Sequence, residues 1–126
     1  MKKIIFTDKA PAPIGPYSQG VQIGNTLYTS GQIALDPATM ELILDDIETE
    51  TRQVMENLKA VLEAAQMSFE DVVKTTIFIT DMGNFARINT VYGSYLNEKT
   101  APARETVQVS VLPKNVNVEI SMVAVK

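Results

Sequence analysis

The sequence predicts an α+β fold: a single mixed sheet of six strands with two helices on one face. Three observations support this prediction. Two segments carry apolar residues at helical spacing, six shorter segments have the alternation or composition of strands, and their order is β-ββ-α-β-α-ββ. The 126 residues contain no linker or low-complexity segment, so we expect one domain, residues 1–126.

Three short strands are expected in the first thirty residues, and residues 4–6 form the first of them. Residues 10–16 contain three prolines and a glycine, which cannot support a regular ladder, so this segment is expected to be a loop. Residues 21–23 and 27–29 flank Gly24-Asn25-Thr26, which has the composition of a hairpin turn.

The two helices are expected over residues 45–65 and after Asn84, with a strand over residues 75–80 between them. Acidic residues at the start of the first helix interact favourably with its dipole. Its apolar stripe consists of Val54, Leu58, Val61, Leu62 and Ala65. The second helix, for which Asn84 is the candidate N-cap, has the stripe Phe85, Ile88, Val91, Tyr92 and Tyr95.

The last two strands are interpreted as a hairpin of residues 106–111 and 116–124, joined by a turn at Leu112-Pro113-Lys114-Asn115. Alternation places Glu119 on the face opposite the core, and Arg104 could project from that same polar face. The residues expected to face the core are Val107, Val109 and Val111 in the first arm and Val116, Val118, Ile120, Met122 and Ala124 in the second.

No element of the chain covers the second face of this sheet. The residues expected there are polar: Thr106, Gln108, Ser110, Asn117, Glu119 and Ser121. Such a face is either solvated or buried against another subunit. We therefore expect an oligomer with sites at the seams between subunits.

Arg104 and Glu119 are the candidate functional pair. An arginine fork is shaped to hold a carboxylate with two parallel hydrogen bonds, and a nearby glutamate could orient or activate water. In the alternative interpretation, Arg104 and Glu119 merely pair with each other or with other charges on a solvated sheet face. Pattern alone favours this alternative, because charged strand residues usually face solvent.

Composition narrows the chemistry. The net charge is −4, with 15 acidic and 11 basic residues, which argues against a broad basic surface for nucleic acid or an anionic membrane. The chain has no cysteine and no histidine, which excludes disulfides, thiolate chemistry, histidine-dependent triads and the usual transition-metal ligand. Any reaction must therefore use carboxylates, Tyr, Ser, Lys, Arg, backbone groups and water.

We expect no targeting segment at the N-terminus. Met1-Lys2-Lys3 begins like a signal sequence, but Thr7, Asp8 and Lys9 interrupt any apolar region, and no window approaches the roughly 18 apolar residues of a membrane-spanning helix. A cytoplasmic protein is expected. The acidic run at residues 45–50 is interpreted as a solvated helix start rather than a metal site.

Several separated segments match the pattern of one family: IGPYSQG (14–20), TSGQI (29–33), RQVMENLK (52–59), VKTT (73–76), residues 85–92 with Asn89, APAR (101–104), and LP (112–113) with VEI (118–120). No single motif is specific, but together they cover nearly the whole chain in register. The chain thereby resembles the RidA family of reactive-intermediate deaminases, of the YjgF type.

The resemblance implies a fold and an activity. The fold is a chorismate-mutase-like mixed six-stranded sheet with two helices on one face, assembled as a homotrimer with its sheets turned inward and a ligand cleft at each subunit interface. Family members hydrolyse 2-imino acids such as 2-iminopropanoate and 2-iminobutanoate, or their enamine forms, to 2-keto acids and ammonia. The resemblance implies no metal and no organic cofactor.

The resemblance also assigns site residues by position. Arg104 resembles the family's carboxylate-binding arginine, and Glu119 matches the glutamate associated with the reactive water. Tyr17, Ser30 and Asn89 match residues that line the cleft. Thr106 stands where cysteine is common, and it would contribute its backbone carbonyl to substrate binding.

Four positions depart from the family pattern. Met40 and Leu44 stand where relatives often have glycine, Glu50 where glutamine is usual, and Gln66 where glycine often ends the helix. These positions surround the acidic loop and the first helix, so they bear on loop shape more than on chemistry.

Three alternative functions remain open on the sequence. The same cleft residues would serve a non-catalytic sensor of 2-keto or related acids. RNA cleavage, also attributed to the family, is opposed by the acidic charge and by the lack of a basic groove with stacking aromatics. A holdase chaperone would require exposed apolar patches, which a sequence does not reveal.

Overall fold

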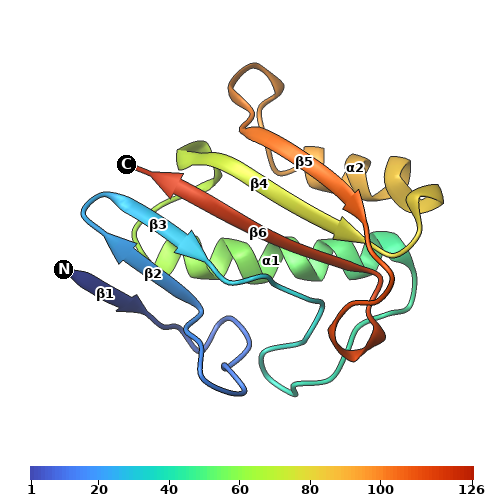
Figure 1. Cartoon of the computed structure of the whole chain (residues 1–126), viewed down its shortest axis with the longest axis horizontal. Helices are drawn as coiled ribbons and strands as arrows, with labels where there is room; N and C mark the ends of the chain where they lie inside the picture. Colours follow the sequence, from blue (N-terminus) through green and yellow to red (C-terminus); the bar gives the residue numbers. More distant parts are fainter.

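The computed structural model describes residues 1–126 as one six-stranded sheet with two α-helices behind it (Figure 1). The strand order is β1-β2-β3-β6-β4-β5, and only the β4–β5 pair is parallel. This confirms the predicted fold class. The elements are β1 (Lys2–Ile5), β2 (Gly20–Ile23), β3 (Thr26–Thr29), α1 (Ile47–Ala64), β4 (Val72–Ile79), α2 (Phe85–Gly93), β5 (Ala103–Gln108) and β6 (Val118–Val125).

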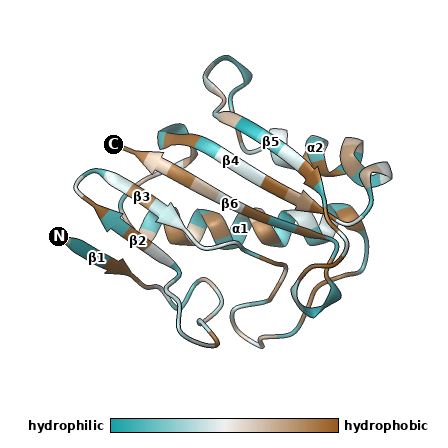
Figure 2. Cartoon of the chain, in the orientation of Figure 1, coloured by the Kyte–Doolittle hydropathy of each residue, from teal (hydrophilic) through white to brown (hydrophobic).

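Both helices form where the apolar periodicity predicts them. Asp46 caps α1, because its side chain accepts a hydrogen bond of 2.7 Å from the backbone N–H of Thr49. Hydrophobic and hydrophilic residues alternate along α1 (Figure 2), and its stripe of Val54, Leu58, Val61 and Leu62 is fully buried. Asn84 occupies the N-cap position of α2, but its side chain makes no capping hydrogen bond. No helix is long and apolar enough to span a membrane.

The predicted C-terminal hairpin is wrong. β6 lies between β3 and β4 and is antiparallel to both, whereas β5 lies at the sheet edge and pairs only with β4. The segment between them is a crossing loop rather than a tight turn, with Lys114 and Asn115 both left-handed at φ +56° and +57°. Burial explains the arrangement: the inward residues of β6, Val118, Ile120, Met122 and Ala124, are at most 2% exposed, which suits a central strand.

The predicted faces of β5 are also wrong. Its register places Arg104 beside Thr75 and Thr106 beside Ile77, and both of these β4 residues are buried on the helix side of the sheet. Arg104, Thr106 and Gln108 therefore lie on the helix side. Glu119 pairs with Phe78 and lies on the open side, as predicted. Val107 and Val111 are 44% and 64% exposed, so neither belongs to the core of the chain.

The open side of the sheet is mixed rather than uniformly polar. Val107, Phe78 and Glu119 form one row across β5, β4 and β6. Tyr28 and Ile4 lie on the same side toward the other edge, and both are about half exposed, at 51% and 52%. A sheet face with this many exposed apolar side chains is suited to contact with another protein surface.

Two of the four departures from the family pattern coincide with left-handed backbone. Met40 and Gln66 both have φ +60°, a conformation that glycine adopts without strain and that costs other residues roughly 1–2 kcal/mol. The structure thus explains why glycine suits these positions. Met40 lies within the loop between β3 and α1, and Gln66 lies just after the end of α1, so the departures leave the sheet intact.

Candidate functional site

Glu119 lies on the open side of the sheet near the start of β6, beside the chain that leaves β3. The backbone of Gln32 bridges to Ile120, which places Ser30 and Gly31 next to Glu119. The Glu119 side chain is about half buried, and this desolvation raises the pKa of its carboxyl group above the usual value. A carboxyl group whose pKa is raised binds a proton more readily than an exposed one, which suits a group that accepts a proton and returns it.

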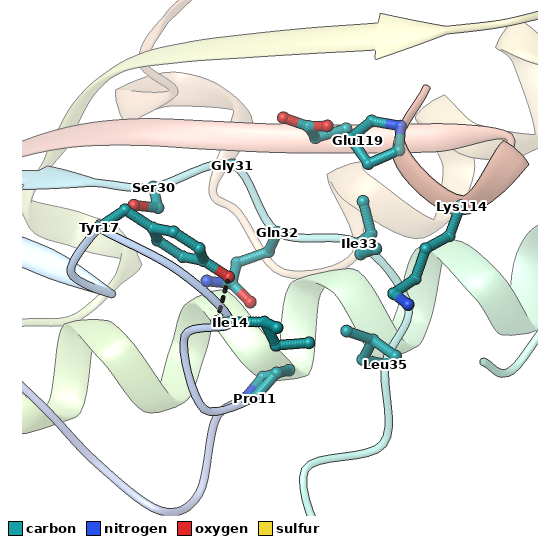
Figure 3. A pocket seen from close by; sticks show the side chains of 11 residues that line it. Pro11, Ile14, Tyr17, Ser30, Gly31, Gln32, Ile33, Leu35, Lys114 and Glu119 are labelled. Carbon is teal, nitrogen blue, oxygen red and sulfur yellow. Dashed lines mark hydrogen bonds between the residues drawn. The ribbon is translucent and has the colours of Figure 1, made fainter. Parts of the chain in front are cut away.

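A cavity of about 500 Å³ opens in front of Glu119; we call it the Glu119 pocket (Figure 3). Besides Glu119 on β6, its lining comes from three loops and includes Tyr17, Ser30, Leu35 and Lys114. Tyr17 is held over the cavity by a hydrogen bond of 3.3 Å that its hydroxyl accepts from the N–H of Ile14. The pocket therefore combines a carboxyl, two hydroxyls and an ammonium with an apolar wall.

Ser30 is fixed within this pocket by two hydrogen bonds. Its hydroxyl donates to the carbonyl of Ser18, and its N–H donates to the carbonyl of Gln19 at 2.9 Å. Because the hydroxyl proton is used, the oxygen of Ser30 faces any ligand as an acceptor. An acceptor at this position suits a ligand that carries an N–H.

Gly31 matters to the pocket because it has no side chain. A Cβ atom at this position would lie 2.8 Å from Cδ of Glu119 and closer still to Oε2. Glycine therefore allows the carboxyl group of Glu119 to lie against the backbone. In the sequence, only the place of Gly31 in the matched TSGQI segment indicates this role.

Arg104 lies apart from this pocket, on β5 against α2. Its Nη1 donates a hydrogen bond of 2.6 Å to Oδ1 of Asn89, and its guanidinium carbon is 5.4 Å and 5.3 Å from the ring centres of Phe85 and Tyr92. These contacts are of the cation–π type and orient the guanidinium. The only ion pairs in the chain are Lys74–Glu105 and Arg87–Glu48, so Arg104 is not neutralised by any carboxylate.

Arg104 opens onto a second cavity of about 690 Å³, the Arg104 pocket, which Asn89, Tyr92 and Pro102 also line. The sequence-predicted residues thus divide into two groups. Tyr17, Ser30 and Glu119 line the Glu119 pocket, whereas Asn89 and Arg104 line the Arg104 pocket. The earlier alternative, in which Arg104 and Glu119 pair with each other, does not occur within the chain.

Thr106 lines neither pocket. It lies two residues beyond Arg104 on the same side of β5, and its hydroxyl oxygen is buried without a hydrogen-bond partner. Because β5 is the edge strand, one side of its backbone has no neighbouring strand and can bind a ligand. No three His, Cys, Asp or Glu side chains gather where they could hold a metal ion.

Comparisons with known sequences identify the family. Residues 7–126 match the family described as Endoribonuclease L-PSP. The chain is 52% identical to a RutC family protein of Pyrococcus horikoshii over 126 residues, which cover 100% of this chain and 99% of that one. It is 46% identical to a 2-iminobutanoate/2-iminopropanoate deaminase of Salmonella typhimurium over 128 aligned positions, with 100% and 99% of the two chains covered.

Solved structures agree with this assignment. A Rid family protein of Yersinia pestis superposes with a TM-score of 0.97 at 46% identity, covering 100% of both chains. Escherichia coli TdcF, solved with bound serine, superposes with a TM-score of 0.92 at 47% identity, covering 98% of both chains. These matches confirm the resemblance to RidA drawn from the sequence motifs. The chain belongs to the Endoribonuclease L-PSP family, which includes the Rid and YjgF proteins.

Proposed function

We propose that this protein is a 2-imino acid deaminase that hydrolyses small imines such as 2-iminopropanoate and 2-iminobutanoate to 2-keto acids and ammonia. The 46% identity to deaminases named for these two substrates supports the proposal. The main observation in its favour is that the two groups required for the reaction lie in two separate pockets. One holds a free arginine for a carboxylate, and the other holds a half-buried carboxyl group for water.

The two pockets form a complete site only between two copies of the chain. Arg104 is on the helix side of the sheet and Glu119 is on the open side, so a small acid cannot contact both within one chain. In a ring of copies, the Arg104 pocket of one subunit can face the Glu119 pocket of the next. The half-exposed Ile4, Tyr28 and Val107 on the open side would be buried by such packing. A closed trimer, which the family resemblance implies, satisfies both requirements.

The proposed mechanism assigns a separate task to each half of the site. Arg104 of one subunit binds the substrate carboxylate and fixes its orientation. Glu119 of the next subunit accepts a proton from water as the water oxygen bonds to C2 of the imine. Glu119 passes this proton to the imine nitrogen, which gives the carbinolamine. The proton of the carbinolamine hydroxyl then moves to the same nitrogen as the C2–N bond breaks and the C2=O bond forms, and ammonia and the 2-keto acid leave. Ser30 and the edge backbone near Thr106 can accept N–H hydrogen bonds during these steps.

The experiment that tests this function supplies the imine in situ. Purified protein is added to a serine or threonine dehydratase reaction, and 2-keto acid release is followed in the presence of an amine that competes for the imine. Faster release with catalytic amounts of the protein supports the proposal. Unchanged release, together with binding of 2-ketobutyrate, favours the non-catalytic sensor instead.

The family description raises RNA cleavage as a competing activity. Neither pocket supports it: each contains one basic residue, Lys114 or Arg104, and the chain carries a net charge of −4 and no histidine. Contact with several phosphates requires a basic groove, and proton transfer at neutral pH most often uses histidine. We therefore do not propose this activity.

The shared site predicts a trimer whose subunits complement one another. Light scattering on a sizing column should give roughly three times the chain mass of 13.8 kDa. Arg104→Ala and Glu119→Ala proteins should each be inactive alone. After co-refolding in equal amounts, random assembly should restore about a quarter of the wild-type activity, because one site in four then receives both intact residues. A monomer at micromolar concentration, or no recovery on mixing, would contradict the shared site.

Gly31→Ala tests the close approach at Glu119. The added methyl group must displace the Glu119 carboxyl group from its place against the backbone, so turnover should fall roughly 10- to 100-fold. Gly31 lacks a left-handed φ, so the backbone itself accepts alanine. Circular dichroism and thermal melting should therefore change little. Full turnover in this variant would show that Glu119 does not act from the position seen here.

A further inference from the structure

The walls of the Glu119 pocket are loops, and the core holds three of them through single buried polar side chains. These side chains are Gln19, Asn57 and Glu50, which are exposed by 1%, 1% and 0%. Buried polar groups are costly unless every hydrogen bond is made, so their presence calls for a physical explanation. Each of them hydrogen bonds to the backbone of a different segment beside the pocket.

Gln19 holds the loop before Tyr17. Its Nε2 donates to the carbonyls of Ala10 at 3.2 Å and Pro11 at 2.9 Å. It also contacts Thr7 twice, donating to the carbonyl at 2.9 Å and accepting from the N–H at 2.7 Å. Pro11 lines the pocket, so these hydrogen bonds fix one wall.

Asn57 holds the loop after β3. From the buried side of α1, its Nδ2 donates to the carbonyls of Ile33 at 3.1 Å and Leu35 at 2.9 Å. Both residues line the pocket. Its own Oδ1 accepts from Gln53 at 2.9 Å, so the amide is held in this orientation.

Glu50 holds the segment that leads into Glu119. Oε2 accepts hydrogen bonds from the N–H groups of Asn117 at 2.8 Å and Val118 at 3.3 Å, and Oε1 accepts from the Asn117 side chain at 2.7 Å. No cation pairs with this buried carboxylate. Three donors on two adjacent residues therefore converge on one side chain, immediately before the residue proposed to activate water.

We propose that Gln19, Asn57 and Glu50 are positioning residues for the Glu119 pocket, and that Glu50 sets the backbone position from which Glu119 reaches the substrate. This inference rests on the proposed function. Displacement of a reacting group by about 1 Å can cost roughly 100-fold in rate, so hydrogen bonds that fix the backbone act directly on turnover. Loss of Glu50 should therefore affect kcat more than KM, because Arg104 of the neighbouring subunit still binds the carboxylate.

Two substitutions at Glu50 separate positioning from packing. Glu50→Met keeps a similar volume and removes all three acceptors, so kcat should fall roughly 10- to 100-fold with KM within about threefold. Glu50→Gln should stay within about threefold of wild type. The oxygen of the glutamine can accept from both backbone N–H groups. Its amide nitrogen can donate to the Asn117 side chain once the Asn117 amide has rotated to present its oxygen.

Controls distinguish positioning from a general loss of stability. Leu62→Ala, a core change in the same helix, should lower the melting temperature but leave kcat of the folded protein unchanged. Glu63→Met, an exposed change in α1, should alter nothing. If Glu50→Met does not fold, Asn117→Ala removes one of the three contacts and should give a smaller loss, roughly three- to tenfold, in kcat.

Amide hydrogen exchange provides a readout independent of catalysis. In Glu50→Met the amides of residues 117–120 should exchange faster while those of α1 remain protected. Inactive wild-type protein would overturn the proposed function, and the exchange experiment would still decide whether Glu50 positions this segment. Wild-type kcat in Glu50→Met, or faster exchange spread evenly over the chain, would overturn the positioning role.

Discussion

Replacing Arg104 with lysine is expected to remove most of the proposed deaminase activity, although the positive charge is retained. The guanidinium is already oriented, with one nitrogen hydrogen bonded to Asn89 and its central carbon over the rings of Phe85 and Tyr92. This leaves its remaining N–H groups free to hold a carboxylate with two parallel bonds. An ammonium group has neither the planar shape nor the fork of donors that a guanidinium offers.

The expected loss can be estimated from the hydrogen bonds involved. Loss of a charge-assisted bidentate contact should cost about 2–4 kcal/mol, which corresponds to roughly 30- to 1000-fold in kcat/KM. The coupled dehydratase assay measures this change, and calorimetry with 2-ketobutyrate should show weakened binding. Arg52→Lys, an exposed change on α1, is the matched control and should behave as wild type. Near wild-type kcat/KM in Arg104→Lys would exclude Arg104 as the carboxylate ligand.

The helices and strands could be predicted from the sequence because their periodicities are local. The stripe of Val54, Leu58 and Val61 identifies a helix whatever lies elsewhere in the chain. Strand pairing is not local: alternation in β5 and β6 predicts which residues share a face but does not name the neighbouring strand. The hairpin prediction failed because β6 does not pair with β5, its nearest strand in sequence. With its buried row Val118, Ile120 and Met122, β6 instead lies in the centre of the sheet, between β3 and β4.

The error in the faces of β5 has a related physical origin. Val107 was assigned to the core because apolar strand residues are usually buried. In the single chain it is 44% exposed, on the open side that the proposed trimer would cover. In the proposed trimer this apolar pattern reflects burial between subunits, whereas the sequence prediction placed Val107 in the core of a single chain. Arg104 and Thr106 were misplaced with it, because one shift of face moves every side chain of a strand.

The candidate site residues could be selected only through the family resemblance. No pattern distinguishes Tyr17 or Ser30 from ordinary loop residues, and Asn89 is one of several polar residues on its helix. The division of the set between two pockets depends on strand order, which the sequence analysis did not predict. The sequence also does not indicate that Gln19 and Asn57 are buried positioning residues, since a polar side chain is usually expected at the surface.

Glu119→Gln should affect the protein differently from Arg104→Lys. Glutamine keeps the size of the side chain and one acceptor oxygen, but it cannot take a proton from water. A residue that acts on water mainly in the transition state should lower turnover and leave ligand binding nearly intact. We therefore expect a loss of roughly 100-fold or more in kcat, with 2-ketobutyrate still binding by calorimetry. Glu41→Gln, an exposed loop change, is the control.

The pH profile tests the same assignment. Because burial raises the pKa of Glu119, the carboxylate needed to accept a proton is lost at a higher pH than for an exposed glutamate. The wild-type kcat should therefore fall as the pH is lowered through this raised pKa. The Glu119→Gln variant should not show this acid-side fall in kcat. If Glu119 has a purely structural role, Glu119→Gln should instead weaken ligand binding and lower thermal stability, and kcat should fall at low pH as in the wild type. Unchanged turnover in Glu119→Gln would remove this residue from the mechanism and leave the chemistry to Arg104 and the edge backbone of β5.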